Sequence, residues 1–68
     1  MSVVKVIELI SESTVSWEEA AQAALKEASK TVENIEGLYV KDLKAVVENN
    51  KITKYRANVK ISFVVKEH

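Results

Sequence analysis

The most regular feature of the sequence is the alternation of apolar and polar residues from Lys54 to Lys66 (KYRANVKISFVVK). Side chains point alternately to the two faces of a strand, so this pattern predicts a strand with one apolar face. The apolar face is expected to carry Tyr55, Ala57, Val59, Ile61, Phe63 and Val65. The other is expected to carry Lys54, Arg56, Asn58, Lys60, Ser62 and Lys66, interrupted by Val64. At about 3.3 Å per residue the strand would be about 40 Å long, more than so short a chain covers alone.

Two further segments predict strands. Val3 to Ile10 (VVKVIELI) is β-branched and carries apolar side chains on both faces, which indicates that neither face is open to water. Either a loop of the same chain or another subunit would cover its second face. Leu38 to Glu48 (LYVKDLKAVVE) has no purely apolar face and favours an edge strand with partners on both sides. Asn49-Asn50 tolerates positive φ and predicts a tight turn into the long strand.

One helix is predicted after the polar connector Ser11 to Val15. Ser16 and Glu19 fit a capping box, in which each side chain satisfies a free backbone N–H of the first turn. The helical pattern extends to about Asn34, and Gly37 is suited to the left-handed geometry that ends a helix. An apolar stripe is expected at Ala21, Leu25, Ala28, Val32 and Ile35, with Trp17 and Ala24 at its edge. The alanines let this helix lie close to a sheet.

The predicted order is β-α-β-β, an α+β fold. The helix returns the chain to its starting end, so the first two strands are parallel to each other and the hairpin makes the third antiparallel to both. The simplest arrangement is a three-stranded antiparallel sheet of order 1-3-2 packed on one helix. One helix covers only one face, which leaves the other face and the strand ends for neighbouring subunits.

Composition supports association between subunits. The 68 residues predict a single domain over 1–68, near the lower size limit for a chain that folds alone. The sequence contains no cysteine, and its one histidine is His68, so disulfides and His- or Cys-based zinc sites are excluded. Apolar residues make up 47%, too many for a disordered chain. Oligomerisation is the remaining way to stabilise so small a domain.

Charge and motifs exclude several functional classes. Ten basic and ten acidic residues cancel, which argues against a general nucleic-acid binder. The sequence has no apolar run of membrane-spanning length and no secretory signal pattern, so we expect a soluble cytoplasmic protein. No nucleophile–base pair, glycine-rich phosphate loop or calcium loop is present, so we do not expect an enzyme. Trp17 is interpreted as a core or interface anchor, with stacking on a ligand as the alternative.

Four segments together resemble the dodecin family: VVKVIELI, SWEEAAQAAL, TVENIEGLYVKDL and YRANVKISFVV, in that order and along nearly the whole chain. The resemblance implies the same β-α-β-β fold and a hollow homododecamer that is not an enzyme. Family members store or buffer small ligands: most of those studied bind flavin pairs at subunit interfaces, and some also hold coenzyme A.

Two residues depart from the flavin-binding pattern that the resemblance implies. Gly37 stands where a tryptophan stacks on the flavin ring, and Arg56 where a glutamine bonds the ring edge. Glycine forfeits the stacking energy, and a guanidinium only donates hydrogen bonds. Asp42 matches the acidic position near the ribityl chain. We therefore expect weak flavin binding or none; Arg56 would bind an anion or pair with a neighbouring carboxylate.

Together, Trp17, Arg56 and the missing tryptophan make the chain look like the calcium dodecin branch, which implies bound calcium rather than flavin. Glu8 aligns with an acidic residue of that branch and is the first candidate for a cation ligand. The alternative is that Glu8 pairs with a lysine across a subunit interface. A purely structural shell is the third interpretation, and the sequence leaves the physiological ligand unknown.

Overall fold

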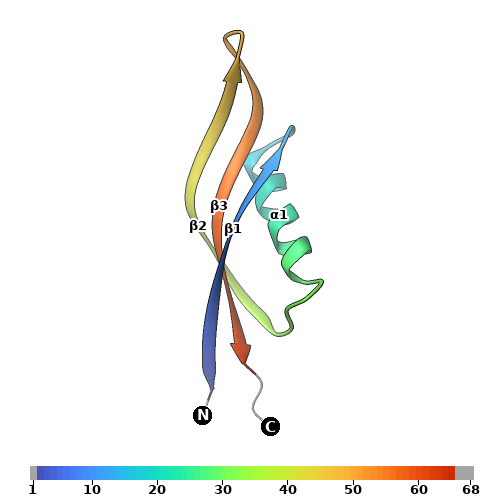
Figure 1. The fold of residues 1–68 in the computed structure, drawn as a ribbon, viewed down its shortest axis with the longest axis vertical. Helices are drawn as coiled ribbons and strands as arrows, with labels where there is room; N and C mark the ends of the chain where they lie inside the picture. The colour runs from blue at the N-terminus through green and yellow to red at the C-terminus, as the bar shows by residue number, and fades with distance from the viewer. Residues whose placement is uncertain (1, 66–68) are drawn as a thin grey trace.

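The computed structural model describes residues 2–65 and has the predicted element order. The elements are β1 (Val3–Ser13), α1 (Trp17–Ala28), β2 (Ile35–Glu48) and β3 (Lys51–Val65). The strands form one sheet of order β1-β3-β2, with both neighbours antiparallel to β3 (Figure 1). The predicted fold class and strand order are therefore confirmed. Lys66 and His68 lie outside the described residues.

The register of the sheet follows from the long central strand. β1 pairs with β3 without interruption from Val3 opposite Val65 to Ser13 opposite Tyr55. β2 pairs with β3 from Ile35 to Glu48, with three register shifts. One shift, between Val40 and Asp42, marks a bulge at Lys41, where β2 holds one residue more than β3. The Asn49-Asn50 turn is confirmed, since the two residues have φ of 51° and 63°.

α1 begins as predicted and ends earlier than predicted. Ser16 is the N-cap, and its side-chain oxygen accepts a hydrogen bond from the Glu19 amide at 3.0 Å. The helix ends at Ala28 rather than near Asn34, because the chain already turns there toward the sheet. Within residues 2–65 no helix is long and apolar enough to cross a membrane.

The predicted role of Gly37 in ending the helix is wrong. Asn34 adopts the left-handed conformation instead, with φ of 61°, while Gly37 has no positive φ and pairs with Ser62 inside β2. The Asn34 carbonyl accepts a hydrogen bond from the Val64 amide at 3.1 Å. Pairing with β3 therefore begins directly after Asn34. The residues from Ile35 onward belong to β2 and are not available to extend the helix.

The buried core is small and consists of one helix stripe against the central strand. Its members are Ala20, Ala24, Ala28, Ala57, Val59 and Ile61. The apolar face predicted for β3 is confirmed. In the predicted helix stripe Ala28 is confirmed, whereas Ala20 and Ala24 are buried in place of Ala21 and Leu25. Ala21 and Leu25 lie at its half-buried edge, and Val32 and Ile35 lie beyond the helix. Alanines at the contact let the helix backbone approach β3 closely.

The second face of β1 remains uncovered in residues 2–65. Ile7 and Leu9 pack against the core from the helix side. Val6 and Ile10 point to the opposite side and are 57% and 67% exposed. Of the two interpretations of this strand, the structure therefore excludes a covering loop within the described part of the chain.

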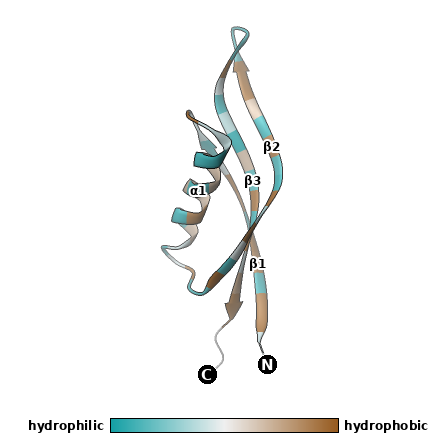
Figure 2. Ribbon diagram, turned by 180° about the vertical axis from the view of Figure 1, so that it is seen from behind, coloured by the Kyte–Doolittle hydropathy of each residue, from teal (hydrophilic) through white to brown (hydrophobic). Residues whose placement is uncertain are grey.

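The molecule is elongated because the sheet is longer than the helix that covers it. Its extents are 53 × 19 × 12 Å and its radius of gyration is 14.1 Å, against about 11 Å for a compact chain of this length. α1 packs mainly on β1 and β3, and the β2–β3 hairpin continues past the start of the helix (Figure 1). Figure 2 shows hydrophobic bands on this uncovered part of the hairpin. The chain thus exposes apolar surface that it does not cover itself.

Candidate ligand site on the open face of the sheet

All four residues singled out from the sequence lie on the sheet face opposite α1, here called the open face. On β3 this face carries the residues that alternate with buried Ala57, Val59 and Ile61. Paired residues of neighbouring strands share a face. The register therefore places Glu8 beside Lys60, Asp42 beside Asn58, and Gly37 beside Ser62, with Arg56 on the same face.

Asp42 and Arg56 lie close together within one chain. They line a small cavity of about 80 Å³ together with Ile10, Lys44 and Asn58. Ile10 and Asp42 flank Asn58 from the two outer strands, and Lys44 pairs with Arg56. The cavity thus combines one carboxylate, one amine, one guanidinium and one amide beside an apolar wall. Such a set can hold a small polar group.

Asn58 was not singled out from the sequence. Its Oδ1 atom is shielded from solvent and has no hydrogen-bond partner among the described residues. An unpaired buried acceptor costs about 1–3 kcal/mol, so a donor that reaches this atom would form a favourable hydrogen bond. The alternation placed Asn58 on the polar face, but the pairing state of its amide depends on both neighbouring strands.

Arg56 is engaged by a carboxylate of its own chain. Its Nε and Nη2 atoms donate to Glu12 Oε2 at 2.9 and 2.6 Å. This hydrogen bond lowers the pKa of Glu12; the positive charges of Arg56 and Lys54 add to the effect, and partial desolvation opposes it. Of the two roles considered for Arg56, the structure has the carboxylate pair, and the partner is Glu12 of the adjacent strand.

Gly37 is far from this cavity in the same chain. Its partner Ser62 lies six residues from Arg56 along β3, which corresponds to about 20 Å. A Cβ atom at Gly37 would meet Ser62 Oγ at 3.0 Å. One chain therefore does not bring Gly37 together with Asp42 and Arg56, and a site that uses all three would need more than one copy.

Glu8 also forms an ion pair within its own chain. Its Oε2 atom is 3.5 Å from Lys41 Nζ, and both side chains are about half exposed. Within residues 2–65 no group of three or more His, Cys, Asp or Glu side chains could hold a metal ion. Calcium takes six to eight oxygen ligands, so Glu8 would need further ligands from other copies.

Trp17 joins the start of α1 to the hairpin. Its Nε1 atom donates to the Lys44 carbonyl at 2.9 Å, and its ring meets Tyr55 edge-on with centroids 5.0 Å apart. Its position agrees with the anchor interpretation, because both polar and aromatic contacts are made inside the chain.

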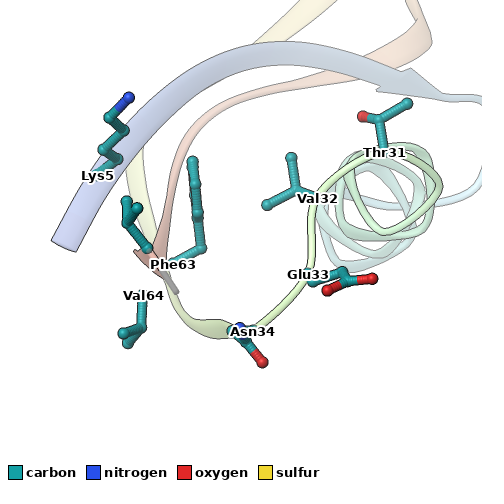
Figure 3. A pocket seen from close by; sticks show the side chains of 8 residues that line it. Lys5, Thr31, Val32, Glu33, Asn34, Phe63 and Val64 are labelled. Carbon is teal, nitrogen blue, oxygen red and sulfur yellow. The ribbon is translucent and has the colours of Figure 1, made fainter. Parts of the chain in front are cut away.

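A larger hollow lies at the other end of the sheet and contains none of the predicted site residues. It has a volume of about 480 Å³. Figure 3 shows Phe63 and Val32 facing each other across it, with Lys5 on the neighbouring β1 strand. The sequence offered no motif for this hollow, because its walls come from β1, β3 and the segment after α1.

Known proteins with a similar sequence include dodecins. The Dodecin family model matches residues 3–66. Calcium dodecin of Mycobacterium tuberculosis is 41% identical over 64 residues, covering 93% of this chain and 89% of the relative.

Solved structures agree as well. A crystal structure of a Thermus thermophilus dodecin variant has a TM-score of 0.94 and 28% identity and covers all of both chains. The crystal structure of the M. tuberculosis calcium dodecin, described as having a novel calcium-binding site, has a TM-score of 0.82 and 33% identity. It covers 94% of this chain and 91% of that one. This chain belongs to the dodecin family.

Proposed function

We propose that the chain is the subunit of a hollow homododecamer that binds or stores a small ligand without catalysing a reaction, and that its flavin pocket is degenerate. The observation that carries this proposal is the Arg56–Glu12 pair. The residue at the ring-edge position has only donors, and a carboxylate of the same chain already accepts from two of its nitrogens, Nε and Nη2. In addition, Gly37 provides no aromatic ring at the stacking position.

The assembly is supported by the shape of the chain. Six buried side chains and a length of 53 Å leave much apolar surface in water, and association is the usual way for such small domains to cover it. Light scattering at micromolar concentration should give a mass near twelve times 7.6 kDa. A monomer or dimer under these conditions would contradict the proposal.

The degenerate pocket is tested by titrating the protein with riboflavin and FMN. We expect no quenching of flavin fluorescence at submicromolar concentration. Strong quenching there would show that Gly37 and Arg56 do not prevent flavin binding.

Gly37→Trp should restore stacking, worth about 0.5–1.5 kcal/mol beyond area burial, or about two- to tenfold in affinity. Because a Cβ here meets Ser62 Oγ, the change is best made with Ser62→Gly. Gly37→Ala in the same background is the control without a ring.

A second candidate function is calcium binding between copies, favoured by the 41% identity to a relative named calcium dodecin. Calorimetry should then show heat with calcium but not with magnesium, and Glu8→Gln should weaken it. Glu27→Gln is the matched control, because Glu27 is also an exposed glutamate in a lysine pair. Equal binding by the wild type and Glu8→Gln would remove Glu8 from the site.

Other expectations from the sequence stay predictions. These are the cytoplasmic location, the single-domain organisation of residues 1–68, and the lack of nucleic-acid or membrane partners. Coenzyme A binding, which the family resemblance implies for some members, also stays an open expectation.

A further inference from the structure

The first observation is the unpaired amide oxygen in the small cavity of the open face. Asn58 Oδ1 is shielded from solvent and accepts no hydrogen bond from the described residues, although three other polar side chains line the same cavity. The cavity has a volume of about 80 Å³, which exceeds the share of liquid volume that one water molecule takes, about 30 Å³. There is therefore room beside Asn58 for a small molecule that donates a hydrogen bond.

The second observation is that two charges of this cavity also lack a partner of their own chain. Asp42 and Lys44 are exposed and line the cavity, yet within residues 2–65 they form no ion pair with each other or with another residue. Arg56 is engaged by Glu12, but these hydrogen bonds use Nε and Nη2 and leave Nη1 as a further donor. The cavity thus offers acceptors and donors at the same time.

The strand register separates the acceptors of the cavity from its donors. Asp42 pairs with Asn58, and Lys44 pairs with Arg56, in two rows that are two residues apart along β3, or about 7 Å. One row carries a carboxylate and the unpaired amide oxygen. The other row carries an amine and a guanidinium. A ligand that contacts both rows must therefore carry hydrogen-bond donors at one end and acceptors at the other.

The balance of charges decides the class of ligand. The formal charges of Asp42 and Glu12 cancel those of Lys44 and Arg56. A simple anion would lie against the Asp42 carboxylate and the Asn58 oxygen, and a simple cation would lie against the lysine and the arginine. Like charges in such contacts are unfavourable. A zwitterion leaves the balance unchanged and meets groups of opposite charge at both ends.

We propose that this cavity binds a small α-amino acid as its zwitterion. The ammonium group is held by Asn58 Oδ1 and Asp42, and the carboxylate by Lys44 and Arg56. Ile10 lines the cavity from β1, so a short apolar side chain of the amino acid contacts it. The proposal rests on the small-ligand role proposed above and names the class of ligand. All the lining residues belong to one chain, so binding needs no contact between copies.

Three probes that differ by one group test the class of ligand. L-alanine carries both charges, propionate lacks the ammonium group, and ethylamine lacks the carboxylate. In saturation-transfer NMR titrations, L-alanine should bind the wild type at least about tenfold more tightly than either of the others, because each of these loses the charge-assisted hydrogen bonds of one row. Equal affinities for L-alanine and propionate would overturn the zwitterion. No binding of L-alanine would overturn the site.

Variants of the lining residues test the placement of the ligand. Asn58→Leu and Lys44→Met should each weaken L-alanine binding about tenfold, whereas Asn58→Asp keeps an acceptor oxygen and should retain it. Lys51→Met is the matched control, because Lys51 is also an exposed lysine of the hairpin and does not line the cavity. Circular dichroism checks that each variant is folded. Unchanged binding of L-alanine by folded Asn58→Leu or Lys44→Met would overturn the placement.

Glu12→Gln tests the charge balance without changing a residue that lines the cavity. It removes one negative charge beside Arg56, so the affinity for propionate should rise relative to that for L-alanine. An unchanged ratio of the two affinities would overturn the charge argument.

Light scattering of the same samples separates this site from the proposed function. An assembled wild type that does not bind L-alanine would overturn the amino-acid site and leave the proposed function standing. A monomeric wild type that binds L-alanine would overturn the proposed assembly and leave the site standing, because the cavity lies within one chain.

Discussion

At the scale of single residues, the open face is organised by charges that cancel inside the chain. Glu12 engages Arg56 and Glu8 engages Lys41, so two of the residues expected to meet a ligand or a neighbouring subunit meet partners of their own chain. Half-exposed ion pairs of this kind contribute little stability. They affect ligand binding instead, because a ligand that contacts Arg56 or Glu8 must either break the existing ion pair or bind beside it.

Replacing Arg56 by glutamine should raise the pKa of Glu12, because the largest cause that lowers it is the hydrogen bond from Arg56. A lowered carboxyl pKa stabilises the folded state above the unfolded pKa, and this stabilisation is lost as pH falls through the folded value. The wild type should therefore lose this stabilisation as the pH falls below about 4. The Arg56→Gln variant lacks the hydrogen bond that causes it, so its stability should not fall for this reason.

Carbon-detected NMR titration of the Glu12 carboxyl measures this change. Lys54→Gln is the graded control: it should raise the pKa of Glu12 less than Arg56→Gln does, since the charge of Lys54 is the smallest of the causes. An unchanged titration of Glu12 in Arg56→Gln would contradict the pairing.

At the scale of elements, the helix shows how close packing decides which face is buried. The spacing of apolar residues at steps of four and three predicted a stripe through Ala21, Leu25 and Ala28, with Ala24 at its edge. The structure buries Ala28 as predicted, and it buries Ala20 and Ala24 in place of Ala21 and Leu25. A stripe of alanines lets α1 lie directly over β3, and the larger Leu25 then projects to the side, where it lines a hollow of about 530 Å³.

Ala24→Leu should destabilise the protein by about 1–3 kcal/mol, because no room is left for a larger side chain between α1 and β3. The neighbouring Ala23 is exposed, so Ala23→Leu is the matched control and should change the free energy of unfolding by less than about 0.5 kcal/mol. Urea unfolding at one fixed protein concentration measures both. Equal effects of the two changes would contradict the observed orientation of the helix.

At the scale of the whole molecule, the sheet is too long for its helix. The hairpin beyond α1 has no covering layer in the described part of the chain, although its apolar residues continue those of the core. Under the assembly proposed above, other copies would supply this layer, and any ligand site that involves both Gly37 and Arg56 would also lie between copies.

Hydrogen exchange should report this missing layer. Under the proposed assembly we expect backbone amides of residues 43–55 to exchange more slowly in the assembled protein than in chains dissociated by dilution, because contact between copies would reduce the opening motions of the hairpin. The amides of Val59 and Ile61, buried within one chain, serve as the internal reference. Equal exchange of the hairpin amides in the assembled and diluted protein would contradict burial of the hairpin between copies.

The sequence by itself determined the features that depend on neighbours along the chain. Alternation predicted the apolar face of β3, Asn49-Asn50 predicted the turn, and Ser16 predicted the start of the helix. The strand order followed, because one helix and one hairpin leave few ways to connect three strands. The resemblance of four segments to dodecins agreed with the family that the comparisons show.

Only the tertiary structure decided the features that depend on competition between distant segments. The helix ends at Ala28 because the residues after Asn34 pair with β3, and that pairing also places Gly37 in a strand. The choice of Glu12 as partner of Arg56, and the unpaired amide oxygen of Asn58, follow from the register of three strands. A local pattern specifies which face a side chain takes, but only the assembled sheet specifies which side chain lies beside it.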